Sequence, residues 1–232
     1  MKKLLSYFSK GELLLWFSSL SVIILSFALF DRENYLTLIA SLLGVTSLIF
    51  GAKGNPLSPF LMIIFSILYG FISLSFRYYG EMATYLGMTL PMSAFALVTW
   101  LKNPYKGNKS QVTVGRIKIK EIIFLCILTA FVTVIFYFIL GYFNTANLLP
   151  STISVATSFA AAYLTARRSP YFALLYAMND TVLIILWILA AKEDISYLSV
   201  IICFVMFLVN DLYGFISWKR MEKRQEKGKN HR

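Results

Sequence analysis

The chain has 232 residues, of which 58% are hydrophobic and 14% are charged, with a net charge of +11 and a mean hydropathy of +0.69. Soluble domains carry about 25% charged residues, so this composition excludes an ordinary water-soluble domain, and its hydrophobicity excludes a disordered chain. Cys126 and Cys203 lie in apolar runs and the single histidine is His231, so we expect no disulfide framework, metal site or cofactor. We predict an all-α integral membrane protein.

Eight apolar segments are long enough to span a bilayer, for which a helix needs about 20 residues. In chain order they cover residues 12–30, 35–51, 57–76, 83–101, 121–143, 149–165, 170–191 and 196–217. The first segment lacks the cleavage pattern of a signal peptide, so we predict that it is a true span. Eight spans leave no room for a sizeable soluble domain, which disfavours most enzymes.

The basic residues of the loops and ends are distributed unequally between the two sides of the predicted bundle. With the N-terminus in the cytosol, 19 of the 22 Lys and Arg residues fall on the cytosolic side, and Arg32, Arg77 and Lys192 fall outside. Cytosolic segments of membrane proteins are enriched in Lys and Arg, so we predict a plasma-membrane protein with both termini cytosolic. The positive charge then serves topology and attraction to membrane lipids, and it indicates no nucleic-acid partner.

Part of the sequence overlays on itself when it is shifted by 111 residues. Residues 41–47 then align with 152–158, and residues 58–60 align with 169–171. We predict two parallel three-helix repeats joined by one helix, with the substrate between them near the bilayer midplane. The chain then divides into an N-terminus with an extra helix (1–34), a first repeat (35–101), a basic loop with a linker helix (102–148), a second repeat (149–218) and a basic cytosolic tail (219–232).

Charged residues are costly at membrane depth and therefore indicate function. Two carboxylates lie well inside the predicted spans, Asp180 and Asp211, and Asp211 is nearer the cytosolic water. Asn179 and Asp180 lie about 14 Å along their helix, near the midplane. Tyr176, Asp180 and Trp187 share one helical face, which suits an aromatic, polar or cationic ligand. The alternative is that Asn179 and Asp180 only join helices through hydrogen bonds.

Further polar residues in the spans are weaker candidates. Asn210 and Tyr213 share a face of the eighth span, where Asn210 either gates the pathway or packs against a neighbouring helix. The hydroxyl of Thr46 can bond within its own helix, and Tyr69 either lines the mouth of a pathway or anchors at the interface. The candidates for substrate binding are therefore Asn179, Asp180, Tyr176, Trp187, Asn210, Tyr213, Tyr69 and Thr46. Three tryptophans are assigned to interfacial aromatic belts: Trp16, Trp100 and Trp218.

The sequence contains none of the common signatures of ATP-driven or hydrolytic chemistry. It has no Walker glycine loop, no H-E-x-x-H and no G-x-S-x-G. We therefore expect a protein that is not an enzyme. A membrane enzyme or a binding subunit acting on lipid stays as an alternative, although no reactive cluster near a headgroup supports it.

Several runs resemble one family in their order and spacing, over about residues 35–220. The runs are residues 38–47, 52–54, 78–82, 90–92, 207–214 and 218–219, together with Trp100. They resemble the nicotinamide riboside transporter (PnuC) family. The resemblance implies a SWEET-like core of three, one and three helices with an extra first helix, assembled as a homotrimer. It also implies facilitated diffusion of a vitamin-like nucleoside, which a cytosolic kinase then traps by phosphorylation.

The sequence also departs from the pattern of that family. Where the family carries tryptophans in the seventh span, this chain has Ala173 and Tyr176, and Asn179 and Asp180 take the polar end of the pattern. Phe65 and Ser93 replace an asparagine and a glutamine. The prediction is therefore a uniporter for nicotinamide riboside or a related nucleoside. The alternatives are thiamine or a deoxyribonucleoside as substrate, and transport coupled to a proton carried by Asp180.

Overall fold

The computed structural model describes residues 7–75, 79–145, 147–192 and 194–230. Eight helices of this part are long and apolar enough to cross a membrane. The first three are α2 (Lys10–Phe30), α3 (Tyr35–Ala52) and α4 (Leu57–Ser75). The fourth span is formed by three consecutive pieces, which are α5 (Tyr79–Thr84), the π-helical turn η1 (Tyr85–Thr89) and α6 (Leu90–Lys102). The last four are α7 (Ile119–Tyr142), α8 (Leu148–Ala166), α9 (Tyr171–Ala190) and α10 (Leu198–Asn230), and the short turn η2 (Ile195–Tyr197) precedes α10. The predicted spans are confirmed, and residues 76–78 of the third loop lie outside the described residues.

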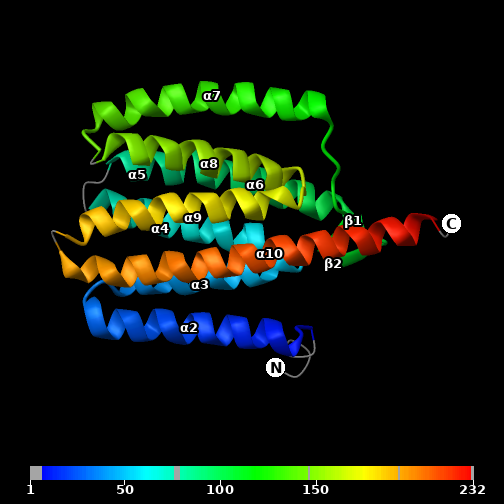
Figure 1. Ribbon diagram of the computed structural model, residues 1–232, viewed down its shortest axis with the longest axis horizontal. Helices are drawn as coiled ribbons and strands as arrows, with labels where there is room; N and C mark the ends of the chain where they lie inside the picture. Colours follow the sequence, from blue (N-terminus) through cyan, green and yellow to red (C-terminus); the bar gives the residue numbers. More distant parts are fainter. Residues whose placement is uncertain (1–6, 76–78, 146, 193, 231–232) are drawn as a thin grey trace.

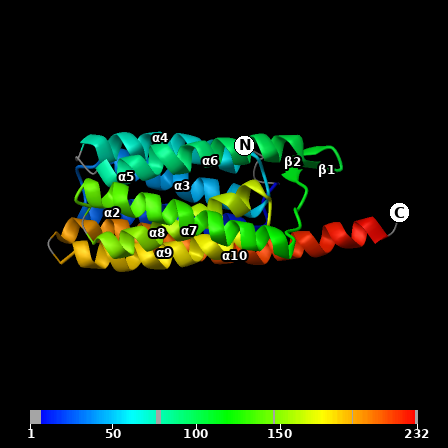
Figure 2. The same ribbon diagram turned by 90° about the horizontal axis from the view of Figure 1, so that it is seen from above.

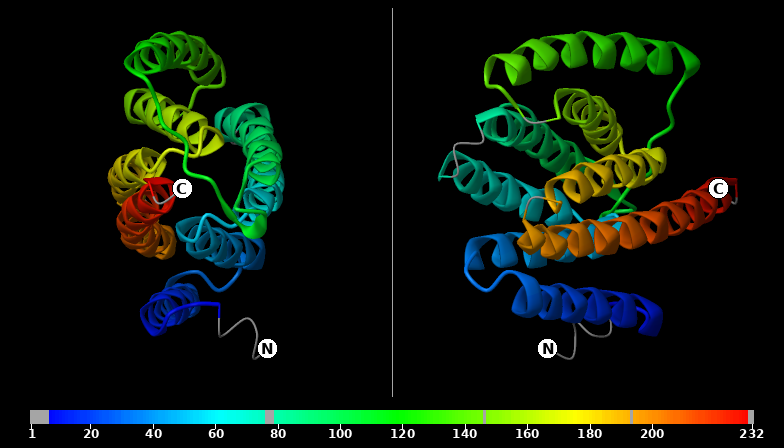
Figure 3. Two further views of the ribbon diagram at one scale, coloured as in Figure 1. Left: turned by 90° about the vertical axis from the view of Figure 1, so that its right-hand side faces the viewer. Right: turned by 60° about the vertical axis from the view of Figure 1, so that its left-hand side comes forward.

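The spanning helices run side by side, with α2 and α7 at opposite edges of the bundle (Figure 1). In the end-on view of Figure 3, α3, α4 and α6 lie on one side of the centre and α8, α9 and α10 on the other. The two groups are joined, because α10 packs on α3 as well as on α9, and α6 packs on α8 as well as on α4.

The last helix is much longer than predicted. α10 has 33 residues, or about 50 Å at 1.5 Å per residue, whereas the hydrocarbon core of a bilayer is about 30 Å thick. The predicted span ended at residue 217 and the tail was treated as a separate segment. The structure instead continues the same helix to Asn230, and Figure 2 shows it extending past the other helices.

A short hairpin, which the sequence analysis did not predict, lies beside this extension. Strands β1 (Pro104–Tyr105) and β2 (Asn108–Val112) pair antiparallel. The turn between them uses Lys106 and Gly107, both with positive φ (49° and 78°), as tight hairpin turns require. Buried Gln225 of α10 fixes the strand: its amide donates to the Val112 oxygen at 3.0 Å, and its oxygen accepts from the Val114 nitrogen at 2.9 Å.

Replacing Gln225 by Ala is expected to detach the hairpin from α10. The change leaves two backbone groups without partners, each at a cost of about 1–3 kcal/mol when buried. Hydrogen exchange of residues 104–115 should then rise at least tenfold. Lys223→Ala removes an exposed side chain from the same stretch of helix and serves as the control. Equal exchange in the two variants would contradict this role of Gln225.

Trp100 and Trp218 do not lie in an interfacial belt, and the prediction is wrong for them. They are 1% and 0% exposed, and their ring centroids are 5.5 Å apart. The two indoles are buried because they donate to carbonyls at helix ends, which lack partners within their own helix. The Trp100 indole donates to the Thr165 oxygen at the end of α8, and the Trp218 indole donates to the Gly51 oxygen at the end of α3, both at 2.7 Å.

The residue before each tryptophan carries a hydroxyl group, which donates to the following carbonyl of the helix that accepts from the indole. Thr99 donates to the Ala166 oxygen at 2.9 Å, and Ser217 donates to the Ala52 oxygen at 2.7 Å. We call Thr99–Trp100 and Ser217–Trp218 the hydroxyl–tryptophan pairs. Each pair ties one group of helices to the other. Trp16 is half-buried, and its indole donates to the Thr46 hydroxyl between α2 and α3 at 3.2 Å.

The ends of α3 and α8 correspond at an offset of 114 residues. α3 ends at Ala52 and α8 at Ala166, and the next helices begin at residues 57 and 171. Left-handed residues, Gly54 (φ 65°) and Arg168 (φ 58°), terminate the two helices in the same way. The sequence overlay used an offset of 111, about one helical turn out of register with these boundaries.

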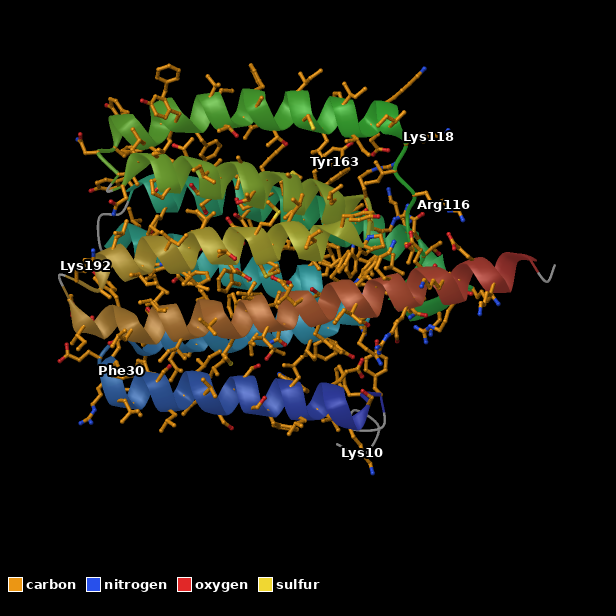
Figure 4. All side chains as sticks on the ribbon, in the orientation of Figure 1. Lys10, Phe30, Arg116, Lys118, Tyr163 and Lys192 are labelled. Carbon is orange, nitrogen blue, oxygen red and sulfur yellow. The ribbon has the colours of Figure 1, made fainter. Side chains whose placement is uncertain are left out.

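The two ends of the bundle differ in charge. Figure 4 labels Lys10, Arg116 and Lys118 at the end from which α10 projects, and Lys192 at the other. The hairpin and the extension of α10 lie at the same end as Lys10. We call it the basic end.

Candidate functional site

A cavity of about 170 Å³ lies at the centre of the bundle, between the two groups of helices. Its walls come mainly from α3, α4, α8, α9, α10 and the fourth span, and α7 contributes Leu140. Its polar lining consists of Ser47, Ser58, Glu81, Thr84, Thr89, Ser93, Thr145, Ser151, Ser154, Ser158, Thr165, Asn179, Asp180 and Asp211. Among the described residues that line it there is no Lys, Arg or His, so the charged groups that the lining can present to a ligand are carboxylates.

Asn179 is held in the cavity wall by the neighbouring helix α8. It is 7% exposed, and its side-chain oxygen accepts hydrogen bonds from Ser154 (2.9 Å) and Thr157 (2.8 Å). The hydroxyls of Ser154 and Thr157 therefore orient the amide. No acceptor for the amide nitrogen of Asn179 is found within the described part of the chain. The nitrogen is therefore available as a donor to a ligand.

Two carboxyl groups meet beside Asn179. Asp180 of α9 and Asp211 of α10 are each 4% exposed and lie within hydrogen-bonding reach of each other. Oδ2 of Asp180 has no hydrogen-bond partner among the described residues. The sequence placed Asp211 near cytosolic water, but the structure buries it in the cavity wall. Adjacent buried carboxylates repel unless a proton or a cation lies between them, so the pair is suited to holding either.

A third carboxyl group, that of Glu81, lines the cavity and was missed by the sequence analysis. The predicted fourth span began at residue 83, which left Glu81 in a loop. The helix in fact begins at Tyr79. Glu81 belongs to residues 78–82, one of the runs that resemble the family, and this resemblance was the sequence signal that could have identified it as a site residue.

Aromatic rings cover much of the remaining wall. Phe65 and Tyr69 of α4 pack with Tyr85, the centroids of Tyr69 and Tyr85 being 4.7 Å apart. On the opposite group of helices, Tyr176 and Trp187 line the cavity from α9. Aromatic faces attract flat rings and cations, so rings and carboxylates together suit a flat cationic ligand.

Five of the eight predicted site residues line this cavity: Asn179, Asp180, Tyr176, Trp187 and Tyr69. The structure does not bring the other three to it, because they face α2. Thr46 accepts from Trp16 (3.2 Å), Asn210 donates to Ser19 (2.9 Å), and Tyr213 donates to Glu12 (3.0 Å). For Asn210 the geometry favours the packing alternative.

The carboxylates of the cavity do not form a metal cage. Over the part of the chain that the structure describes, no group of three His, Cys, Asp or Glu residues could hold a metal ion.

Comparison with known proteins gives a consistent set of similarities. The family described as nicotinamide mononucleotide transporter matches residues 34–220. The nicotinamide riboside transporter PnuC of Neisseria mucosa is 26% identical over 200 residues, covering 84% of this chain and 76% of that protein. PnuC of Haemophilus influenzae is 23% identical over 193 residues, covering 83% and 82%. The crystal structure of the vitamin B3 transporter PnuC superposes with a TM-score of 0.80 at 22% identity, covering 94% of both chains.

Proposed function

The chain belongs to the nicotinamide mononucleotide transporter family, and we propose that it imports nicotinamide riboside, or a related vitamin-like nucleoside, by facilitated diffusion. Its similarity to two PnuC nicotinamide riboside transporters supports this proposal. The chain is thus a multi-pass membrane transporter, as the resemblance in its sequence indicated. The observation that carries the proposed substrate is the central cavity, which combines aromatic rings with carboxylates and has no basic side chain among its described lining residues.

The charge of the substrate matches this lining. The nicotinamide ring of the riboside carries a fixed positive charge, and so does the thiazolium ring of thiamine, whereas deoxyribonucleosides are neutral. Asp180, Asp211 and Glu81 favour the cations, and the rings of Tyr69, Tyr85 and Trp187 can stack on them. The cavity therefore favours nicotinamide riboside or thiamine over a deoxyribonucleoside.

The movement that we propose is a rocking of two parallel three-helix repeats around the cavity. The first repeat would be α3, α4 and the fourth span; the second would be α8, α9 and α10; α7 would link them, and α2 would be the extra helix. The common offset of 114 residues and the matching left-handed caps support this division. The hydroxyl–tryptophan pairs support it too, since each ties the last helix of one repeat to the first helix of the other.

The proposal includes an orientation and a fate for the substrate. We place the basic end in the cytosol, because Lys and Arg are retained on that side, and we expect the chain to assemble as a homotrimer. A cytosolic kinase would then phosphorylate the imported nucleoside, and the charged product could not leave by the same route.

A calorimetric binding panel in detergent tests the substrate. It compares nicotinamide riboside, thiamine and deoxyuridine on the wild type. We expect the cations to bind and deoxyuridine to bind at least tenfold more weakly. Binding of deoxyuridine alone, or of no member of the panel, would refute the proposed substrate.

The contact between Asp180 and Asp211 favours one second candidate, a transporter coupled to protons. A carboxyl pair that shares a proton could release it when a cation enters between them. Uptake into proteoliposomes would then respond to an imposed pH gradient. Uptake that is indifferent to gradients of either direction would exclude this candidate and support facilitated diffusion.

The hydroxyls behind Asn179 provide a finer prediction. Thr157→Val removes one of the two donors that orient the amide, and a net hydrogen bond contributes about 0.5–1.5 kcal/mol. Affinity for nicotinamide riboside should fall about 3- to 10-fold in calorimetry. Thr181→Val is the control, since that hydroxyl bonds to Ala177 of its own helix (2.9 Å). An unchanged affinity in Thr157→Val would show that Asn179 does not contact the ligand.

A further inference from the structure

A second cavity, of about 480 Å³, lies at the basic end of the bundle. Four segments enclose it: the start of α2, the end of α3, strand β2 and the extension of α10. It shares only Ala52 with the lining of the central cavity. Its basic lining consists of Lys53, Arg220 and Arg224. We call it the basic pocket.

Hydrogen bonds fix the walls of the basic pocket. The Tyr7 hydroxyl donates to the Ser110 oxygen of β2 at 3.0 Å and accepts from the side-chain amide of Asn55 at 3.2 Å. Gln225 holds β2 against α10, as described above. The pocket is therefore a defined recess that links three membrane helices with the hairpin.

The one acidic residue of the lining is already fully engaged. Glu12, which is 5% exposed, accepts from Lys53 at 3.1 Å, from the Tyr213 hydroxyl at 3.0 Å and from the Ser9 nitrogen at 2.7 Å. Its charge offsets that of Lys53. Two positive charges of the lining are left without an acidic partner in the pocket.

Those two charges are the guanidinium groups of Arg220 and Arg224. They lie one helical turn apart, on the same face of α10, and neither enters an ion pair with any described residue. Two neighbouring cations do have partners: Lys219 pairs with Glu222 at 2.6 Å, and Arg116 pairs with Glu226 at 2.7 Å. Lys223 and Lys227 of the same stretch of helix enter no ion pair with a described residue either, but they do not line the pocket, whereas Arg220 and Arg224 do.

We propose that the basic pocket binds a phosphate group, carried either by a soluble phosphate monoester or by the headgroup of an anionic phospholipid. Guanidinium groups present paired donors that match phosphate oxygens. The part of α10 that carries them projects beyond the hydrocarbon core, at the level where headgroups and soluble phosphates are both within reach. This proposal is independent of the substrate in the central cavity.

Two double variants test the proposal on the full-length protein. Arg220→Gln with Arg224→Gln removes both unpaired charges from the pocket. Lys223→Gln with Lys227→Gln removes two charges from the same exposed stretch of helix, at positions that do not line the pocket. The pairs are matched in charge, so a general electrostatic effect changes both alike. All four side chains are exposed, and unchanged thermal unfolding without ligand verifies the fold.

Two measurements distinguish the sources of the phosphate. Thermal unfolding in detergent is followed with inorganic phosphate or phenyl phosphate, against chloride at equal ionic strength. Native mass spectrometry compares retention of phosphatidylglycerol with that of phosphatidylcholine.

We expect the wild type and the lysine variant to respond to one of these phosphates, and the arginine variant to lose at least tenfold in affinity or retention. A response to the soluble anions identifies a monoester site, and selective retention of phosphatidylglycerol identifies a lipid site. Equal behaviour of the arginine and lysine variants in both measurements would overturn the proposal.

Discussion

Replacing Asp180 by Asn is expected to weaken the binding of nicotinamide riboside about 10- to 100-fold. The substitution keeps the shape of the side chain and removes its charge from a site that is 4% exposed. A hydrogen bond or contact to a charged group contributes about 1.5–3 kcal/mol, and each 1.4 kcal/mol is tenfold in affinity. The effect is large because Oδ2 of Asp180 has no other partner among the described residues. Calorimetry in detergent measures it.

The matched control for this substitution is Asp194→Asn. Asp194 lies in the exposed turn before α10, where its side chain caps η2 by accepting from the Ser196 nitrogen at 2.9 Å, and Asn can do the same. Its affinity should equal that of the wild type. Glu81→Gln should weaken binding as well, but less than Asp180→Asn, because Glu81 is only half-buried. An Asp180→Asn variant that binds like the wild type would remove Asp180 from the site.

Replacing Trp218 by Ala is expected to destabilise the bundle by about 3–5 kcal/mol, the usual cost of truncating a buried tryptophan. The ring is 0% exposed and packs against Phe172 with centroids 5.1 Å apart and against Trp100 at 5.5 Å. The change also leaves the Gly51 carbonyl without its donor. Thermal unfolding of the purified protein should show a marked fall in Tm.

Two further variants separate the packing of Trp218 from its hydrogen bond. Trp218→Phe keeps an aromatic ring and loses the indole donor, so we expect an intermediate fall in Tm. Trp16→Ala removes a half-buried ring from the interface of α2, outside the region that matches the family, and should cost less than Trp218→Ala. If Trp218→Ala unfolds at the wild-type temperature, the hydroxyl–tryptophan pairs do not hold the two groups of helices together.

The membrane helices could be predicted from the sequence because the bilayer itself sets their length and composition. The hairpin could not, since β2 is a short polar strand whose position depends on contacts with Gln225, more than 100 residues away. Trp100 and Trp218 were misassigned because an indole suits both a membrane interface and a buried carbonyl. Only the packing of α6 on α8 and of α10 on α3 decides between these environments.

The site was predictable where a polar residue had no reason to lie in the membrane other than contact with a ligand or a helix. That reasoning found Asn179 and Asp180. It failed on α10, where Asn210 and Asp211 are adjacent in sequence but about 100° apart around the helix. One faces α2 and the other faces the cavity. The sequence does not say which face meets the extra helix, and Glu81 was missed because a span boundary was four residues out.

Uptake of radiolabelled nicotinamide riboside into proteoliposomes that contain only this chain tests the central claim most directly. We predict saturable uptake that is faster than uptake into protein-free liposomes. Unlabelled thiamine or nicotinamide riboside should inhibit this uptake more than deoxyuridine does. The Asp180→Asn substitution should reduce it at least tenfold at low substrate concentration. Uptake no faster than in protein-free liposomes, or uptake that Asp180→Asn leaves unchanged, would contradict the assignment of the central cavity as the substrate site.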